Sequence, residues 1–475
     1  MRDWTLAAVA EAVGAELAAE LGDRRVGPDV VIDSRLATPG SLFVALPGER
    51  VDGHDFAGAA AAGGAVAALC SRPVAADLTS LVVADPQRAL ADLARAVIAQ
   101  ERARGLRTIA LTGSSGKTST KDILAQVLAR AGATVSPPGS FNNEIGVPLT
   151  ALHVDADTRY LVSEMGARGL GHVAWLCSVV PPDIAAVLNV GHAHVGEFGS
   201  VAAIAAAKGE IIEGLDETGW AVLNADDPLV AAMAPRTAAR IACFSGSGRP
   251  AAGELRVWAD DAVPDELQRY GFTLHAEGPA GGSALVQLRV SGRHQVHNAA
   301  AAAAVALAAG LGLDEVAAGL SSAVPLSRWR MELQPRPDGV LIVNDAYNAN
   351  PDSMAAALAT VAGLRRPGGR LIAVLGDMLE LGADGPEAHR ALGRAAAGGG
   401  FEVIGVGELG AEIAAAAAAA GGRAAAAAGA DEALRLARTG LTAGDVVLVK
   451  ASRGLALDRV ALRLMDPDDH QGAAT

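Results

Sequence analysis

Residues 111–118 constrain the fold of this chain more than any other segment. They read Leu-Thr-Gly-Ser-Ser-Gly-Lys-Thr, which is close to a phosphate-binding loop. Such a loop needs glycines that let backbone N–H groups close around phosphate oxygens, a lysine for the β- and γ-phosphates, and a hydroxyl for Mg²⁺. The residues that supply these groups, with the serines of the same cradle, are Gly113, Ser114, Ser115, Gly116, Lys117, Thr118 and Ser119. The full pattern also requires glycine at position 111, where Leu111 stands.

The sequence on either side of the loop predicts matching secondary structure. The apolar run 108–111 predicts a buried strand, and residues 121–130 predict a helix whose N-terminal dipole faces bound phosphates. A short glycine–lysine match alone is a weak signal, and a plain strand–turn–helix is the alternative. With the strand and the helix in place, the pattern favours an ATP site.

Length and charge limit the other functions open to the chain. Its 475 residues suggest about three domains. A hydrophobic content of 51% with 19% charged residues indicates packed cores rather than disorder. The net charge of −14 argues against nucleic acid or an anionic membrane surface as the main partner.

Other features of the sequence predict a cytoplasmic protein. The three cysteines are far apart and form no C-x-x-C motif, which fits a reducing compartment. Glu11 and Glu16 interrupt the alanine-rich N-terminal segment, unlike the apolar core of a secretory signal. The alanine tracts 299–309 and 414–428 are predicted to form helices, not membrane spans.

Secondary-structure patterns predict an α/β protein of three domains. The first is a small α/β domain over residues 1–84, followed by a linker helix within 85–106. Its short strands are expected at 30–32, 42–46, 65–69 and 81–83.

The central domain is expected over residues 107–322, where strands alternate with helices as in a mostly parallel sheet. Strands are predicted at 160–163, 184–190 and 220–223, an antiparallel excursion at 254–290, and a closing alanine-rich helix at 298–310. Polar residues at the carboxyl ends of such strands lie where open α/β sheets bind ligands.

The third domain, residues 323–475, is predicted to be Rossmann-like. Its strands are expected at 340–344, 370–375, 402–406 and 445–450, with helices between them. No G-x-G-x-x-G motif follows its first strand, so dinucleotide binding is disfavoured.

Three further residues become informative only together. Glu164 ends a predicted strand, and a single strand-end glutamate is more often a cap or a surface charge. His194 alone is more often structural, and Lys208 on a helix would ordinarily be solvated.

However, the segments 112–121, 164–166, 189–199 and 208–210 resemble the Mur ligases in order and context. These are ATP-dependent, amide-forming enzymes of peptidoglycan precursor synthesis, and they share the missing first glycine.

Motifs in all three predicted domains are similar to the branch of this family that adds D-alanyl-D-alanine. They are Asp-Ser-Arg at 33–35, Pro-Gly-Ser-Leu-Phe-Val-Ala at 39–45, Asp-Gly-His-Asp-Phe at 52–56, Phe-Asn-Asn-Glu-Ile-Gly-Val-Pro at 141–148, Asp-Ala-Tyr-Asn-Ala-Asn-Pro at 345–351, Gly-Asp-Met-Leu-Glu-Leu-Gly at 376–382 and Val-Lys-Ala-Ser-Arg at 449–453.

The resemblance implies a specific reaction. A peptide carboxylate attacks the γ-phosphate of ATP to give an acyl phosphate, and an amine then displaces phosphate through a tetrahedral intermediate. Because two anions must meet, metals and cations must offset their charge. The expected substrates are UDP-N-acetylmuramoyl-tripeptide, bound by the first domain, ATP, bound by the central domain, and D-alanyl-D-alanine, bound by the third. The expected enzyme is a monomer.

The resemblance also assigns metal ligands. Thr118 and Glu164 would bind a first Mg²⁺ beside Lys117. His194, with His192 as its rival, would bind a second Mg²⁺ together with Lys208 as a carbamate. A free lysine is almost entirely cationic at neutral pH, and only the neutral amine can add CO₂.

For the nucleotide, the resemblance implies Asn298 near adenine and Arg330, with Arg328 as a competitor, near the phosphates. Gln295 departs from the asparagine usual in the family, which leaves its role open. Asp345 would face ATP.

For the other substrates, Ser34 and Arg35 would bind uridine and diphosphate oxygens, since the arginine fork suits phosphate. An ordinary surface ion pair is the alternative. The remaining substrate-binding candidates are Asn142, Asn143, Tyr347, Asn348, Asn350, Lys450, Ser452 and Arg453. The Asn-Pro pair at 350–351 can also be simply a helix entry.

Several alternatives remain open at this point. Two share the mechanism: the diamino-acid-adding sister ligase and folylpolyglutamate synthetase. The motifs at 345–351 and 376–382 argue against both. A P-loop small-molecule kinase and a non-catalytic nucleotide-binding protein belong to different classes. The sequence does not distinguish diaminopimelate from lysine as the third residue of the peptide.

Overall fold

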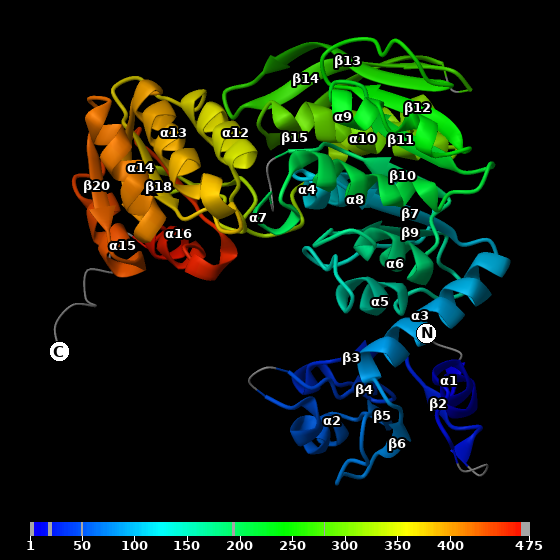
Figure 1. The fold of residues 1–475 in the computed structure, drawn as a ribbon. Helices are drawn as coiled ribbons and strands as arrows, with labels where there is room; N and C mark the ends of the chain where they lie inside the picture. Colours follow the sequence, from blue (N-terminus) through cyan, green and yellow to red (C-terminus); the bar gives the residue numbers. More distant parts are fainter. Residues whose placement is uncertain (1–3, 18–20, 49–50, 192–194, 280, 467–475) are drawn as a thin grey trace.

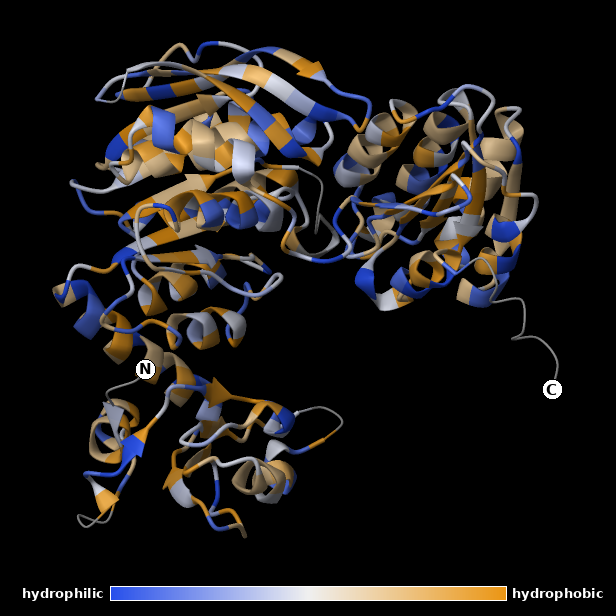
Figure 2. Cartoon of the chain, turned by 180° about the vertical axis from the view of Figure 1, so that it is seen from behind, coloured by the Kyte–Doolittle hydropathy of each residue, from blue (hydrophilic) through white to orange (hydrophobic). Residues whose placement is uncertain are grey.

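Figure 1 shows the computed structural model of the chain, which describes residues 4–17, 21–48, 51–191, 195–279 and 281–466. Three α/β domains follow one another along the sequence, each built on its own sheet. The first and third domains both adjoin the central one and leave an opening between them. In Figure 2 the strands inside the large sheets are hydrophobic, and hydrophilic residues lie on the outer faces of the helices.

The N-terminal domain has a parallel sheet of four strands in the order β3-β4-β5-β6, beside a two-stranded ribbon of β1 and β2. Its elements are β1 (Trp4–Thr5), α1 (Leu6–Val13), β2 (Arg25–Val26), β3 (Val30–Val31), β4 (Leu42–Val44), α2 (Ala57–Ala62), β5 (Ala67–Cys70) and β6 (Thr79–Val82). Helix α3 (Pro86–Ala103) then leads to the central domain, as predicted for the linker. Asp85 begins this helix by capping the N–H groups of Gln87 and Arg88.

The central domain has a nine-stranded sheet in the order β15-β14-β13-β12-β11-β10-β7-β9-β8. The strands from β8 to β13 are parallel, and β13, β14 and β15 form the predicted antiparallel excursion. The strands are β7 (Arg107–Thr112), β8 (Thr134–Val135), β9 (Tyr160–Glu164), β10 (Ile184–Val187), β11 (Trp220–Asn224), β12 (Arg240–Ser245), β13 (Leu255–Pro264), β14 (Arg269–Glu277) and β15 (Gly282–Ser291).

Helices cover both faces of this sheet. Helices α5 (Gly146–Ala151), α6 (His172–Val179) and α8 (Val201–Glu213) pack with α3 on one face. Helices α4 (Lys117–Leu128), α10 (His294–Ala308) and α11 (Leu313–Ser322) cover the other. The short helices α7 (Val195–Phe198) and α9 (Pro228–Ala231) lie in connections. Alanines let α10 pack closely against α4 and the sheet, so most of this helix is buried.

Three predicted boundaries in this domain were wrong. Helix α4 begins at Lys117 rather than at 121, because left-handed Gly116 turns the chain directly into the helix. Strand β10 ends at Val187 rather than at 190. Helix α10 does not close the unit, because α11 follows it and packs against α4 and β15.

The C-terminal domain has a six-stranded sheet in the order β16-β17-β21-β18-β19-β20, parallel except for β16. The strands are β16 (Glu332–Pro335), β17 (Leu341–Asn344), β18 (Leu371–Gly376), β19 (Phe401–Val406), β20 (Ala424–Ala427) and β21 (Val446–Lys450). Helices α12 (Pro351–Ala362), α13 (Gly385–Gly398) and α14 (Glu408–Ala419) pack on one face, and α15 (Ala430–Arg438) and α16 (Asp458–Leu464) on the other.

The alanine tract 414–428 was predicted to be helical, but only its first part is, because its second part contains a strand. Helix α14 ends at Ala419, Gly421 adopts a left-handed conformation, and the chain returns as β20. Parallel pairing of β20 with β19 outweighs the helix propensity of alanine.

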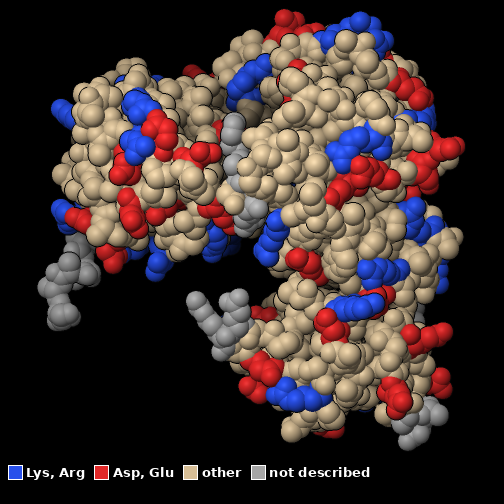
Figure 3. Space-filling model, in the orientation of Figure 1, with Lys and Arg blue, Asp and Glu red and all other residues tan. Residues whose placement is uncertain are grey.

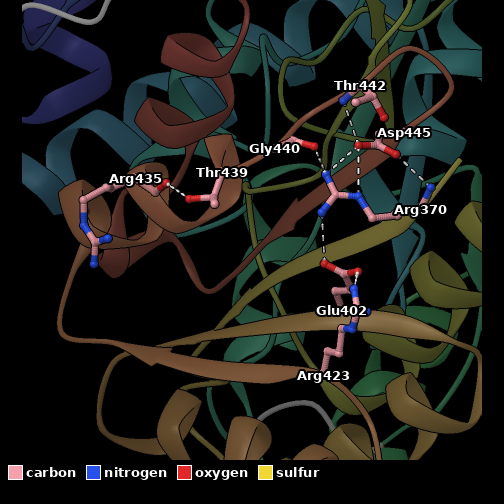
Figure 4. Close-up of polar contacts among 8 residues, drawn as sticks. All are labelled: Arg370, Glu402, Arg423, Arg435, Thr439, Gly440, Thr442 and Asp445. Atoms are coloured by element: carbon pink, nitrogen blue, oxygen red, sulfur yellow. Dashed lines mark hydrogen bonds and ion pairs between the residues drawn. The ribbon is translucent and has the colours of Figure 1, made fainter.

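A charged network ties together the amino-terminal edge of the C-terminal sheet (Figure 4). Arg370 contacts fully buried Asp445 at 2.7 Å and Glu402 at 3.3 Å. Asp445 also accepts the backbone N–H groups of Arg370 and Thr442, at 2.8 and 3.0 Å. These contacts join the starts of β18 and β21 to β19, at the edge opposite the one that carries Lys450. The network therefore supports the frame of the domain rather than its chemistry.

Among the helices that the structure describes, none combines the length and hydrophobicity needed to cross a lipid bilayer.

Candidate active site

A cavity of about 680 Å³ lies at the carboxyl ends of the central strands, where the C-terminal domain meets the central one. This is the expected ligand position for an open α/β sheet. The predicted residues that line it are Ser114, Ser115, Gly116, Lys117, Thr118, Ser119, Asn142, Asn143, Glu164, Lys208, Asn298, Arg330, Asp345, Tyr347, Asn348, Asn350, Lys450, Ser452 and Arg453. Lys and Arg side chains occur around the opening between the domains, although the chain as a whole is acidic (Figure 3).

The phosphate-binding loop is held in shape by its neighbours. The side chain of Asn189 accepts the Ser115 N–H at 2.9 Å and donates to the Ser115 carbonyl at 3.1 Å. Lys117 folds back so that Nζ donates to the Gly113 carbonyl at 2.7 Å. Burial lowers the pKa of Lys117, with a smaller contribution from nearby Arg330 against the opposing effect of Glu164. The loop is thus a formed, cationic cradle.

Glu164 is fully buried beside this cradle. One carboxylate oxygen accepts the Thr118 hydroxyl at 2.9 Å, and the other accepts Ser140 and the Asn142 amide, each at 2.8 Å. Arg330 donates to Thr118 Oγ1 at 2.8 Å. Carboxylate and hydroxyl oxygens are the ligands that Mg²⁺ prefers, so the Thr118–Glu164 pair fits that ion.

Lys208 lies on α8 with 3% of its surface exposed, which excludes the solvated-face interpretation. Burial, together with the neighbouring Lys117 cation, holds the pKa of Lys208 well below its ordinary value. His194, its predicted partner, and His192, the rival of His194, lie outside the described residues. Within the residues described, no group of three or more His, Cys, Asp or Glu side chains could hold a metal ion.

Asn298 and Gln295 form a buried pair on α10. The Asn298 amide donates to Gln295 Oε1 at 2.9 Å. This bond turns the Asn298 carbonyl toward Gly116, where a Cβ atom would lie 2.6 Å from it. The structure thus gives the unusual Gln295 a contact: it orients Asn298 against the phosphate-binding loop.

The C-terminal wall of the cavity is fixed by an ion pair. Lys450, 3% exposed, donates to Asp345 Oδ2 at 2.7 Å and to the Asn348 carbonyl at 2.8 Å. The other Asp345 oxygen accepts the Met331 N–H at 3.0 Å. Asn350 caps α12 through Ser353, which confirms the helix-entry interpretation of this motif.

Arg330 is placed by an unusual backbone. Trp329 and Met331 on either side of it adopt left-handed conformations, with φ of 60° and 50°. The Arg330 guanidinium lies 4.3 Å from the centre of the Tyr347 ring, and Arg453 stacks in the same way on Trp329 at 4.2 Å. Arg328, the competitor of Arg330, is exposed and does not line the cavity.

The linker between the last two domains is anchored on the helix that follows the phosphate-binding loop. Asp122 accepts the Ser327 N–H at 2.9 Å. Gln126 accepts the Val324 N–H at 3.1 Å and donates to the Val324 carbonyl at 2.9 Å. Sequence reasoning missed both anchors, because polar residues on a helix carry no motif that separates such a role from solvation.

The remaining predicted residues have local partners. Arg35 is 86% exposed and forms a forked pair with Asp33 at 2.6–3.1 Å, which lowers the pKa of Asp33 to about 2. Ser34 is buried, and neither Ser34 nor Arg35 lines the cavity. Asn143 accepts the Gly146 N–H at 2.8 Å at the start of α5. The surface ion pair that the sequence left open at Arg35 is therefore present.

Three domain models of one known family together match most of the chain. The Mur ligase family catalytic domain matches residues 29–107, the Mur ligase middle domain residues 111–306, and the Mur ligase glutamate ligase domain residues 329–453.

Individual relatives match over nearly their whole length. The UDP-N-acetylmuramoyl-tripeptide–D-alanyl-D-alanine ligase of Mycobacterium tuberculosis H37Rv is 45% identical, over 98% of this chain and 99% of the relative. The enzyme of the same name from Escherichia coli K12 is 38% identical over 92% and 93%. Among solved structures, MurF from Acinetobacter baumannii has a TM-score of 0.83 at 34% identity, covering 97% and 98%. The MurF ligase of Thermotoga maritima in complex with ADP has a TM-score of 0.76 at 31% identity, covering 92% and 96%. The chain belongs to the Mur ligase family.

Proposed function

We propose that this chain joins D-alanyl-D-alanine to UDP-N-acetylmuramoyl-tripeptide, with ATP converted to ADP and phosphate. The observation that carries the proposal is the single cavity that brings the phosphate-binding loop together with the motifs at 345–351 and 449–453. Relatives of 45% and 38% identity bear the name of this activity, and another was solved with ADP.

The arrangement of charges supports the first step, attack of the substrate carboxylate on the γ-phosphate. Lys117 and Arg330 provide two cations beside the cradle, one from each domain. Both offset the charge of the transferred phosphoryl group, as in other phosphoryl transfers. Thr118 and Glu164 would hold Mg²⁺, which when bound neutralises phosphate charge. The acyl carbon then bears a phosphate leaving group that the dipeptide amine can displace.

Lys208 fits the role of a carbamate. Its lowered pKa makes the neutral amine more abundant than in an exposed lysine. The nitrogen of the neutral amine forms a bond to the carbon of CO₂ while one C–O π bond opens, and the nitrogen releases one proton to solvent. This converts the neutral amine into an anion. That anion would hold a second Mg²⁺ with His194.

Each domain has its own part in the proposed reaction. Residues 1–84 form the UDP-substrate domain, 85–106 the linker, 107–322 the ATP domain and 323–475 the dipeptide domain. The enzyme acts in the cytoplasm as a monomer, without a nucleic acid partner.

The substrate requirement tests the proposed function directly. Phosphate release from ATP should require both UDP-tripeptide and D-alanyl-D-alanine, and the mass of the product should equal the joined substrates less water. Equal activity with UDP-dipeptide and a free diamino acid would identify the sister ligase. A stable phosphorylated product formed without any amine would identify a kinase. Parallel assays with tripeptides ending in diaminopimelate or lysine identify the third residue.

Arg35 tests the N-terminal domain separately. Arg35→Ala should weaken UDP-substrate binding by roughly 10- to 100-fold, the effect of a lost charge-assisted contact of about 1.5–3 kcal/mol. ATP binding should stay nearly unchanged, because Arg35 does not line the cavity. Titration of each ligand by calorimetry measures both affinities. Unchanged affinity for the UDP-substrate would leave the Asp33–Arg35 pair as a surface contact only.

A further inference from the structure

The motif Gly-Asp-Met-Leu-Glu-Leu-Gly at 376–382 has no function in the scheme above. It follows β18 at the carboxyl edge of the C-terminal sheet, and Leu379 and Glu380 line the cavity. We call residues 377–382 the β18 loop. Leu379 is apolar yet 46% exposed, so the loop presents a hydrophobic side chain to the cavity.

The β18 loop is held from within its own domain. The Asp377 side chain accepts the Gly410 N–H at 2.7 Å at the start of α14. Ser452 donates its N–H to the Asp377 carbonyl at 3.1 Å and accepts the Leu379 N–H at 3.0 Å on its hydroxyl. The loop is thereby joined to Ser452, next to Arg453 on the wall of the cavity.

His389 on α13 also holds the β18 loop. Its ring is fully buried, and Nε2 lies 2.8 Å from the Met378 N–H while Nδ1 lies 2.6 Å from the Gly385 carbonyl. A backbone N–H can only donate, so Nε2 must be the acceptor. Nδ1 must then carry the proton and donate to Gly385. The contacts fix one neutral tautomer, and that tautomer connects the two ends of the segment 378–385.

The opposite side of the loop meets the central domain. The Glu380 carbonyl accepts the N–H of Gly196, in α7, at 3.1 Å. A Cβ atom on Gly196 would lie 2.7 Å from the Gly382 nitrogen and 2.9 Å from the Glu380 oxygen. Gly382 has φ of 58°, and its own Cβ would lie 2.9 Å from Gly196 Cα. At this point the β18 loop and α7 meet through backbone atoms, and a Cβ atom on either glycine would clash.

We propose that His389 is a positioning residue for the ligation reaction. It holds the β18 loop in the shape that docks on Gly196. This docking places the cavity wall that the C-terminal domain provides against the phosphate-binding loop. The proposal rests on the proposed function for its kinetic consequences only. His389 is separated from the cavity by the loop and acts through Met378.

Two substitutions at this position separate the docking role from simple packing. The amide of His389→Asn can still donate to Gly385 in place of Nδ1, but it leaves the Met378 N–H without its acceptor. The longer side chain of His389→Gln can place its oxygen where Nε2 was and keep the Met378 contact. The kinetic constants for D-alanyl-D-alanine and ATP, with the melting temperature as a control for folding, measure both variants.

The asparagine variant should lower kcat/KM for the dipeptide by roughly tenfold or more, the order expected for a buried N–H left unpaired. The glutamine variant should stay within about threefold of the wild type, because it keeps that bond. KM for ATP should change little in either. If His389 only fills the core, the two variants lose activity equally, and the proposal is wrong.

A double-mutant cycle with Gly196→Ala tests the connection between the domains. If His389 acts through the contact at Gly196, the losses from His389→Asn and Gly196→Ala should not multiply in the double variant. Losses that multiply would overturn the proposal.

Amide hydrogen exchange in the full chain gives a readout that needs no substrate. His389→Asn should speed exchange at Met378 and also at Gly196 in the other domain, whereas His389→Gln should do neither. Faster exchange confined to the C-terminal domain would show a structural effect only and refute the docking role. A wild-type enzyme that ignores D-alanyl-D-alanine would contradict the proposed function instead, and the exchange result would still decide the role of His389.

Discussion

Lys208→Ala should abolish ligation while the protein stays folded. The variant removes the amine that would add CO₂, and with it the anion expected to hold a second Mg²⁺. The assay is phosphate release in the presence of both substrates, with circular dichroism and the melting temperature as checks on folding. The variant removes an amine that is costly to bury but leaves a cavity in place of the lysine stem, so we expect a folded protein whose melting temperature is at most modestly lower.

Two controls make the Lys208 result specific. Lys208→Arg keeps a positive charge and cannot form a carbamate, so it should be as inactive as the alanine variant. Short carboxylates such as formate should restore part of the activity of Lys208→Ala but not of Lys208→Arg. In the wild type, carbon-13 bicarbonate should give a carbamate signal that Lys208→Ala lacks. Near-normal activity of the alanine variant would refute the role.

Lys117→Met should lower kcat by about 10³-fold or more, because it removes a preorganised charge from the transferred phosphate. Methionine keeps the shape of the buried stem, and it removes a cation whose pKa is lowered mainly by burial. Relief of the buried charge is offset by loss of the Nζ bond to the Gly113 carbonyl, so the melting temperature should change little while activity disappears.

Steady-state phosphate release and thermal unfolding measure the two effects in the same preparation. Lys121→Met is the matched control one turn further along α4. Its amine does not face the cavity, but donates to the Pro137 carbonyl and forms a buried ion pair with Asp122. This control should lower the melting temperature and leave kcat within about tenfold. Activity of Lys117→Met within tenfold of the wild type would exclude Lys117 from the phosphate site.

The sequence predicted the architecture because its strongest signals are local. Apolar runs followed by glycine or polar residues marked the parallel strands, and the loop at 111–118 marked the site edge of the central sheet. Strand β20 was not predicted because its alanines favour a helix, and only pairing with β19 makes them a strand. Strand β16 was not predicted because it lies at the edge of the C-terminal sheet and has no apolar run.

Sequence motifs identified candidate residues for the site. The burial and the neighbours of these residues could not be predicted, because they depend on the fold. Lys208 was identified by resemblance, but its burial beside Lys117 is a property of the fold. His389 had no signal of its own, since a lone histidine on an amphipathic helix resembles any core residue. The Asp33–Arg35 pair shows the converse, because a residue in a recognisable motif can form an ordinary surface ion pair.

The contact between Arg330 and Thr118 is made from a strained segment of backbone, because Trp329 and Met331 both have positive φ. Left-handed conformations of large side chains cost on the order of 1–3 kcal/mol each. The chain is anchored at Ser327 on one side and paired in β16 from Glu332 on the other, so this strain is confined to four residues, 328–331. Relaxing either residue would change the direction of the chain at Arg330 and move its guanidinium away from Thr118 Oγ1. The strain and the contact between Arg330 and the phosphate-binding loop are therefore coupled, so any movement that separates the two would also release the strain.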